Sequence, residues 1–272
     1  MHRVAGMAVL AGMALAGAYV AGPAGAQEAV DLELALAVDV SGSIDAEEAQ
    51  LQRDGYVAAF RDPEVIRAIE QGMLGRIAVA YYEWAGLSHV RVIVEWTLIE
   101  DDASAHAFAA RLALQPPQTV RRTSISSAID FAVPFFERNE FDGARHVVDV
   151  SGDGANNSGD LVTNARDRAV AAGVTINGLP IMNGRLGPFG WPPIPDLDLY
   201  YENCVIGGPG AFLVVANGFE EFAEAVRRKL ILEIAGRTPA DGPRIVPAQV
   251  TAERIPPPCD IGERRMRDFE NN

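Results

Sequence analysis

Two serines and an aspartate with alternate spacing follow an apolar run near the start of the chain. The run covers residues 32–38, and Asp39, Ser41 and Ser43 follow it at every second position. Alternate residues leaving a strand can turn one carboxylate and two hydroxyls toward a common point, and Gly42 lets the backbone bend tightly between them. All three groups are hard oxygen donors, which suit Mg²⁺ or a similar ion. Taken alone, the same pattern also suits a helix-capping turn that binds no metal.

Two further oxygen side chains stand at comparable junctions later in the chain. Thr123 begins the segment Thr-Ser-Ile-Ser-Ser-Ala-Ile at the start of an expected helix, and Asp153 with Gly154 follows an expected strand over 147–150. Each by itself is an ordinary helix-capping or turn residue. Ligands of parallel sheets bind beyond the carboxyl ends of the strands, however, so all three junctions point to one edge. The predicted metal ligands are Asp39, Ser41, Ser43, Thr123 and Asp153, with Mg²⁺ as the expected ion and Mn²⁺ or Ca²⁺ as alternatives.

The elements that must position these residues alternate between strand and helix. Strands are expected over 32–38, 75–84, 147–150, 174–181 and 212–215, and the main helices over 45–60, 101–114, 123–138, 160–172 and 219–235. Residues 89–97 alternate between apolar and charged types, which indicates a half-exposed edge strand joined to its neighbour by a short turn. This order predicts an α/β fold with a doubly wound, mostly parallel central sheet, helices on both faces and one antiparallel edge strand.

With its elements in this order, the chain resembles the von Willebrand factor type A (VWA) domain over about residues 31–235. The metal-ion-dependent adhesion site (MIDAS) of that family has the pattern Asp-x-Ser-x-Ser, then a distant Thr, then a distant Asp-Gly, and each part has its match here. The resemblance implies that the two serines and the threonine touch the metal, while the two aspartates act largely through bound water. It also implies a binding function, in which an acidic side chain of a protein or peptide completes the metal's coordination.

The chain more closely resembles a family of exported bacterial proteins of unknown function built on this domain. The likeness lies in Val-Asp-Val-Ser-Gly-Asp-Gly at 148–154 and Val-Ile-Gly-Gly-Pro-Gly-Ala-Phe at 205–212. Within the first stretch, Asp149 lies inside an apolar strand, where a charge needs a partner or a hydrogen-bond network. A supporting role behind the metal ligands is one interpretation of this residue.

A phosphatase is the competing interpretation. Residues 152–157 resemble the metal-binding loop of haloacid dehalogenase-type phosphatases, in which an aspartate after the first strand attacks phosphorus. Asp39 would then be the nucleophile, but Ser41 replaces the usual acid/base aspartate and cannot readily shuttle a proton at neutral pH. We therefore expect no catalytic residue and favour binding over hydrolysis.

The N-terminal residues have the pattern of an export signal. A short positive start, an apolar run and Ala24-Gly25-Ala26 predict a secretory signal peptide over residues 1–26, with an uncleaved membrane anchor as the alternative. The protein is therefore expected in the periplasm or outside the cell, with no membrane span after signal removal. A net charge of −14 without any basic run argues against a nucleic-acid partner.

One domain is expected over 27–236, followed by a tail over 237–272 that is rich in proline and charge and cannot build a core of its own. Cys204 belongs to the domain and Cys259 to the tail. Two cysteines in an oxidising compartment suggest a disulfide that pins the tail to the domain, with two free thiols as the alternative.

A long loop over residues 183–195, rich in glycine and proline, follows an expected parallel strand. It carries Phe189 and Trp191. Long loops without regular structure are often functional, so this loop is either a border of the metal face or a packed connector.

Overall fold

The computed structural model describes residues 27–187, 191–236, 244–245 and 254–271, and the signal peptide predicted for residues 1–26 lies outside these ranges. Within them, seven strands form one sheet in the order β4-β3-β2-β6-β7-β8-β9. The strands are β2 (Glu33–Asp39), β3 (Ile77–Trp84), β4 (Val90–Ile99), β6 (His146–Gly152), β7 (Val174–Pro180), β8 (Leu213–Val214) and β9 (Arg244–Ile245). All neighbouring pairs are parallel except β3 and β4, so the predicted antiparallel edge strand is confirmed.

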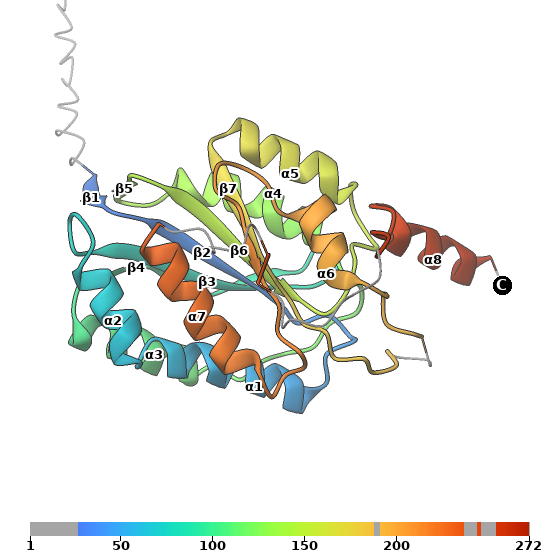
Figure 1. Ribbon diagram of the computed structural model, residues 1–272, viewed down its shortest axis with the longest axis horizontal. Coiled ribbons are helices and arrows are strands. Elements are labelled where there is room, and N and C mark those ends of the chain that lie inside the picture. Colours follow the sequence, from blue (N-terminus) through green and yellow to red (C-terminus); the bar gives the residue numbers. More distant parts are fainter. Residues whose placement is uncertain (1–26, 188–190, 237–243, 246–253, 272) are drawn as a thin grey trace, which may run out of the picture.

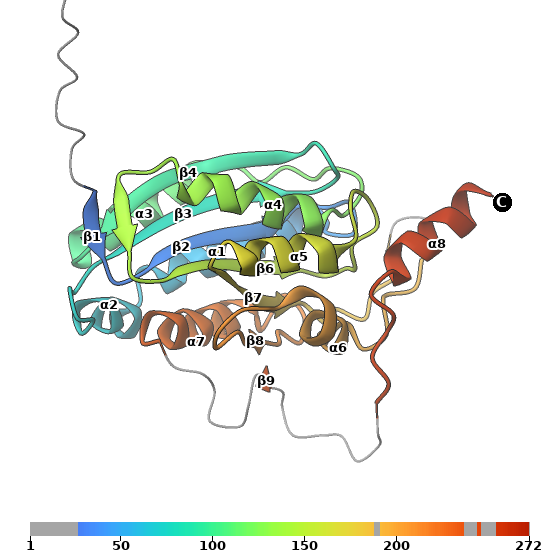
Figure 2. The ribbon, with the colours of Figure 1, turned by 90° about the horizontal axis from the view of Figure 1, so that it is seen from above.

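Helices cover both faces of this sheet (Figures 1 and 2). One face carries α1 (Ala46–Ala59), α2 (Pro63–Glu70), α3 (Asp102–Ala113) and α7 (Phe222–Ile234). The other carries α4 (Ile125–Phe136), α5 (Val162–Ala171) and α6 (Leu197–Tyr200), which continues as a π-helical turn over Tyr201–Val205. The predicted doubly wound α/β fold is therefore confirmed.

The central strand β2 shows why the sequence folds this way. Leu34, Leu36 and Val38 pack on the side of α1 and α7, while Ala35 and Ala37 pack against the opposite helices. A strand buried on both faces reads as an unbroken apolar run, which is the signal that predicted it. The strand therefore delivers its last residue to the carboxyl edge of the sheet, between two covered faces.

The buried carboxylate of Asp149, in the middle of β6, lies on the face of the sheet that α7 covers. Its Oδ1 lies 2.6 Å from Nζ of Lys229 on α7, and the same Lys229 contacts Glu233 one turn later. Asn177 of β7 donates a hydrogen bond of 2.9 Å to Glu233. This network supplies the partners that the charge requires, so the position of Asp149 is explained without a metal.

Two small features complete the fold. β1 (Glu28–Val30) pairs in parallel with β5 (Phe141–Gly143), apart from the main sheet. The tail contains a helix, α8 (Ile261–Glu270), which the proline-rich composition did not predict. Figures 1 and 2 place α8 at the opposite end of the molecule from β1. No helix within the described ranges combines the length and apolar character needed to cross a bilayer.

Candidate metal centre

The turn after β2 holds the first predicted ligands. Asp39 ends the strand and is fully buried, and its Oδ1 accepts a hydrogen bond of 2.6 Å from the backbone N–H of Ser41. Its Oδ2 is also buried and has no hydrogen-bond partner among the described residues. The carbonyl of Ser41 accepts from the N–H of Ile44 at 3.0 Å, which closes the turn. One carboxylate oxygen is thus fixed and the other is left without a partner.

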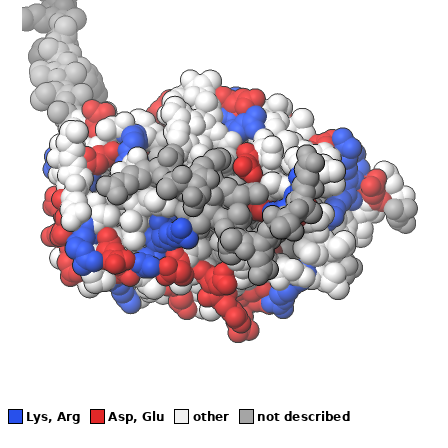
Figure 3. Space-filling view, viewed as in Figure 1, with Lys and Arg blue, Asp and Glu red and all other residues white. Residues whose placement is uncertain are grey.

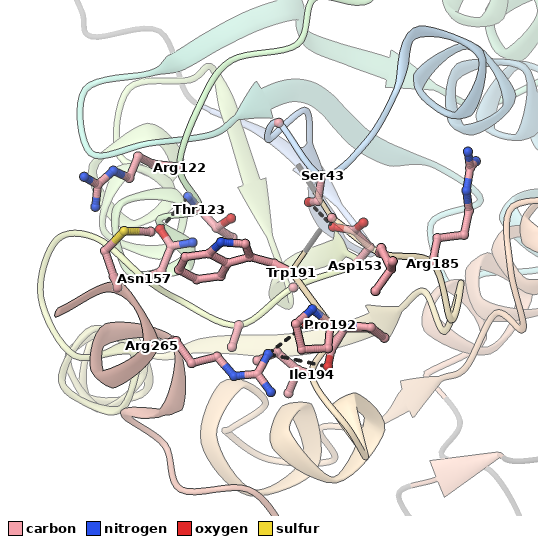
Figure 4. Close-up of a pocket in the computed structure, with 18 of the residues that line it drawn as sticks. Ser43, Arg122, Thr123, Asp153, Asn157, Arg185, Trp191, Pro192, Ile194 and Arg265 are labelled. Carbon is pink, nitrogen blue, oxygen red and sulfur yellow. Dashed lines mark hydrogen bonds between the residues drawn. The ribbon is translucent and has the colours of Figure 1, made fainter. Parts of the chain in front are cut away.

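Asp153, beyond the end of β6, joins this turn through Ser43. The Ser43 hydroxyl donates to Oδ1 of Asp153 at 2.6 Å (Figure 4). It also lies 3.1 Å from the Ser41 hydroxyl. The side-chain amide of Asn183 donates to the other oxygen of Asp153 at 3.0 Å. The two serines and the aspartate therefore form one continuous group of oxygen atoms.

Thr123 reaches the same place from a third junction. It stands one residue before Ser124, the N-cap of α4, so the predicted start of this helix at Thr123 was two residues too early. Its backbone N–H donates to Oδ1 of Asn157 at 2.9 Å, and its carbonyl accepts from the Asn157 N–H at 2.9 Å. A methyl group at Gly154 would lie 3.9 Å from the Thr123 hydroxyl. The structure thus brings all five predicted residues to one edge of the sheet.

Gly152, the last residue of β6, brings the backbone close to Asp39. A methyl group here would lie 2.8 Å from Oδ2 of Asp39 and 2.9 Å from the hydroxyl of Tyr201. The Tyr201 hydroxyl is buried and has no hydrogen-bond partner among the described residues. The missing side chain of Gly152 therefore leaves room for the Asp39 carboxylate and the Tyr201 hydroxyl beside the end of β6.

The electrostatics of this edge favour positive charge. Burial raises the pKa of Asp39 well above its usual range, and the neighbouring charge of Asp153 raises it further. Burial likewise raises the pKa of Asp153 to about 6, with Glu48 adding to the effect. Both carboxylates are thus costly to ionise in the absence of a cation.

A cavity of about 440 Å³ opens from this site. Ser43, Thr123 and Asp153 contribute to its lining, and the remaining lining residues include parts of the 183–195 loop and of α8. In Figure 4, Trp191 of the loop stands in the middle of these residues, with Asp153 on one side and Arg265 on the other. The loop therefore borders the candidate metal face, as one of its two interpretations predicted, while Phe189 lies outside the described residues.

Sequence analysis missed three polar residues that support the site. Asn157 holds Thr123, Asn183 holds Asp153, and Tyr201 approaches Asp39. Asn157 was visible in the Gly-Asp-Gly-Ala-Asn-Asn stretch, which was compared with a phosphatase loop, and Asn183 closely follows the end of β7. No sequence motif pointed to Tyr201, because it lies in a helical turn far from Asp39 in the sequence.

Histidine and cysteine take no part in this site. The described residues hold no cluster of three or more His, Cys, Asp or Glu side chains that could bind a metal. The candidate site instead combines two carboxylates with three hydroxyl groups. These are hard oxygen donors, which suit Mg²⁺-like ions. The residues present therefore fit the predicted kind of metal site.

Comparisons with known proteins agree with this architecture. The family described as "Protein of unknown function (DUF1194)" matches residues 29–238. No curated protein sequence matches the chain.

Solved structures similar to this one include VWA domains. Proximal thread matrix protein 1 from the mussel byssus, in a structure with a zinc-occupied MIDAS motif, aligns with a TM-score of 0.54 at 16% identity, covering 77% of this chain and 49% of that one. The hypothetical protein BatB from Bacteroides thetaiotaomicron aligns with a TM-score of 0.51 at 19% identity, over 75% and 99%. A von Willebrand factor type A protein from Catenulispora acidiphila aligns with a TM-score of 0.51 at 14% identity, over 76% and 43%.

These likenesses establish the fold. The chain spans about half the length of the mussel protein, so only part of that protein is matched. Both predicted resemblances, to the VWA domain and to a family of unknown function, are confirmed.

Proposed function

This chain belongs to the DUF1194 family, and we propose that it is an exported module that binds a divalent cation and uses it to hold a protein or peptide partner. Asp39, Ser41, Ser43, Thr123 and Asp153 would hold the metal. The bound ion would supply a positive charge with an open coordination position. An acidic side chain of the partner would fill that position.

The observation that carries this proposal is a difference between buried carboxylates. Among the described residues, other buried carboxylates have a basic side chain beside them: Glu83 contacts Arg53, Asp149 contacts Lys229, Asp198 contacts Arg254, and Glu33 contacts His146. Asp39 and Asp153 are also buried, yet neither forms an ion pair with any described residue. Because burying unpaired carboxylates is costly, a cation from outside the chain is the most direct compensation.

The donor types favour a hard divalent cation and an acidic partner. Serine and threonine hydroxyls are neutral oxygen ligands, so they leave much of the ion's charge for an incoming carboxylate. The zinc reported in the mussel protein's MIDAS motif supports a divalent ion in sites of this kind. We favour Mg²⁺ for this chain, because its donors are all oxygen atoms.

Binding fits the site better than phosphate hydrolysis does. The phosphatase alternative requires Asp39 as an accessible nucleophile, but its side chain is fully buried and one oxygen is occupied by the Ser41 N–H. The residue where an acid/base aspartate would stand is Ser41, which lies against Ser43. The similarity to VWA domains also supports a binding module.

Export is supported by the bond between the two cysteines. The structure joins Cys204 and Cys259 with an S–S distance of 2.03 Å. Such bonds persist mainly in oxidising compartments, which agrees with the signal peptide predicted from the sequence.

Calorimetric titration of the mature protein with Mg²⁺, Mn²⁺ and Zn²⁺ tests the metal. We expect one specific site in the wild type and a loss of more than about 100-fold in affinity in Asp39→Ala, since a buried anchor of the site is removed. Asp167→Ala is the matched control, because this aspartate is exposed. Equal binding by wild type and Asp39→Ala would refute the site.

A pull-down from the exported fraction tests the partner. We expect specific capture in Mg²⁺ that is lost with chelator and with Asp39→Ala. Capture that is indifferent to both would refute metal-dependent binding.

A further inference from the structure

We infer that the partner segment carries a large apolar side chain close to its acidic one in the sequence, and that α8 and loop residues 191–194 together form the subsite that receives it. This inference rests on the proposed function, since the acidic side chain is taken to reach the metal. It adds a second point of recognition, beside the metal, that would select among acidic partners.

The cavity beside the metal ligands has an apolar wall drawn from two distant segments. Trp191 and Ile194 come from the loop, whereas Met266 and Phe269 come from α8. The rings of Trp191 and Phe269 meet edge to face with their centroids 5.1 Å apart, which joins the two segments. The cavity's volume of about 440 Å³ falls within the range of sites that bind small ligands, and apolar lining with a few convergent polar groups is their usual composition.

Specific contacts hold this wall against the metal-binding loops. Arg265 of α8 donates to the carbonyl of Pro192 at 2.9 Å. The side-chain amide of Asn156, three residues after Asp153, donates to Glu263 of α8 at 2.7 Å. Gly262 packs so closely on Asn156 that a methyl group there would lie 2.0 Å from its carbonyl oxygen.

The disulfide between Cys204 and Cys259 anchors the chain just before α8. The helix is therefore held in place before any partner arrives, which reduces the entropic cost of binding. The wall that α8 contributes lies beyond residue 238, where the match to the DUF1194 family ends. Partner selection would therefore depend in part on a segment outside the matched region, and in part on the loop inside it.

Arginines line this cavity although the molecule as a whole is acidic. The chain carries a net charge of −14, and the described cavity lining contains four arginines, at 121, 122, 185 and 265, and one carboxylate, Asp153. Two of these arginines pair with carboxylates outside the lining: Arg122 contacts Glu270, and Arg185 contacts Glu48. Figure 3 shows Lys and Arg side chains spread over this face of the molecule, with some of them at the end that carries α8. The guanidinium groups along the cavity complement an acidic segment better than a basic one.

Short capped peptides test the inference on the full mature chain. Gly-Asp-Phe-Gly is titrated in Mg²⁺ beside Gly-Asp-Ala-Gly and Gly-Asn-Phe-Gly, with fluorescence anisotropy as the readout. We expect replacement of Phe by Ala to weaken binding at least about tenfold, and replacement of Asp by Asn to abolish it. The preference for Phe should fall below about threefold in Phe269→Ala and Met266→Ala.

Two controls separate a lost subsite from a damaged fold. Leu114→Ala removes an exposed apolar side chain elsewhere and should leave the preference unchanged. Phe269 is half exposed, so its replacement should leave the thermal midpoint close to that of the wild type.

The outcomes distinguish this inference from the proposed function. Absence of metal binding in direct titration would overturn both. Metal-dependent binding of the acidic peptides with no preference for Phe would overturn the inference alone. Binding of phenylpropionate as tightly as Gly-Asp-Phe-Gly would overturn it in favour of a small organic anion.

Discussion

Gly152 offers the sharpest test of how the fold positions Asp39. In Gly152→Ala, the new methyl group would lie 2.8 Å from Oδ2 of Asp39, which is about 0.6 Å less than the 3.4 Å at which ordinary contact begins. Asp39 cannot simply turn away, because its other oxygen holds the Ser41 N–H at 2.6 Å. The Tyr201 hydroxyl, 2.9 Å from the methyl group, blocks another side. The carboxylate must therefore shift by several tenths of an ångström.

The size of the effect follows from this crowding. Overpacking a buried site costs about 1–3 kcal/mol, so we expect the free energy of unfolding to fall by that amount. Mg²⁺ requires near-ideal octahedral geometry, and disturbed supporting residues typically cost about 10–100-fold in metal affinity. Denaturant unfolding measures the first quantity, and calorimetric titration with Mg²⁺ measures the second.

Gly154→Ala is the matched control in the same turn. Its methyl group would lie 3.9 Å from its nearest neighbours, both atoms of Thr123, and neither glycine has a left-handed backbone conformation. We expect unchanged metal affinity and a gain in stability of up to about 1 kcal/mol from lower entropy of the unfolded chain. Wild-type metal affinity in Gly152→Ala, or equal losses in both variants, would refute the reasoning.

Three further predictions concern the disulfide, the pH dependence of metal affinity and stability, and the chemistry of the site. Replacing Cys204 and Cys259 together by serine should lower the free energy of unfolding by about 4 kcal/mol in the chain-entropy model, given their separation of 55 residues; an unchanged denaturation midpoint would contradict this. Metal affinity should fall about tenfold from about pH 7 to about pH 5, because the pKa of Asp153 is about 6 and the proton competes with the metal; a flat titration series would contradict this. In the absence of metal, the free energy of unfolding should change with pH in the opposite direction. The folded state holds the Asp153 proton more tightly than the unfolded state does, so the protein should become less stable as the pH rises from about 4 to about 6. Ser41→Asp should weaken metal-dependent partner binding and create no phosphate-ester hydrolysis, whereas metal-dependent turnover by the wild type that disappears in Asp39→Asn would establish the phosphatase.

The main sheet and its helices were predictable because their signals are local. β2 reads as an apolar run, and α1 begins at a capping box, in which Asp45 and Glu48, three residues apart, each accept from the other's backbone N–H. The alternating residues of β4 identified the edge strand for the same reason. α8 escaped prediction because it is a polar helix held by the disulfide and by packing on Asn156. Contacts of this kind leave no periodic trace in the sequence.

The candidate site divides along the same physical line. The metal ligands stand at strand ends and helix starts along one edge of the sheet. A short motif and the direction of the strands were therefore enough to predict that Asp39 and Asp153 lie close together. The apolar wall of the cavity depends on where tertiary packing puts Trp191 and Phe269, which are 78 positions apart in the sequence. A metal held by these ligands could bind any acidic side chain. The apolar lining from the loop and α8 would limit which residue can stand beside that acidic side chain in the partner. Metal binding and partner selection should therefore be separable by mutation, with Asp39→Ala removing both and Phe269→Ala removing selection alone.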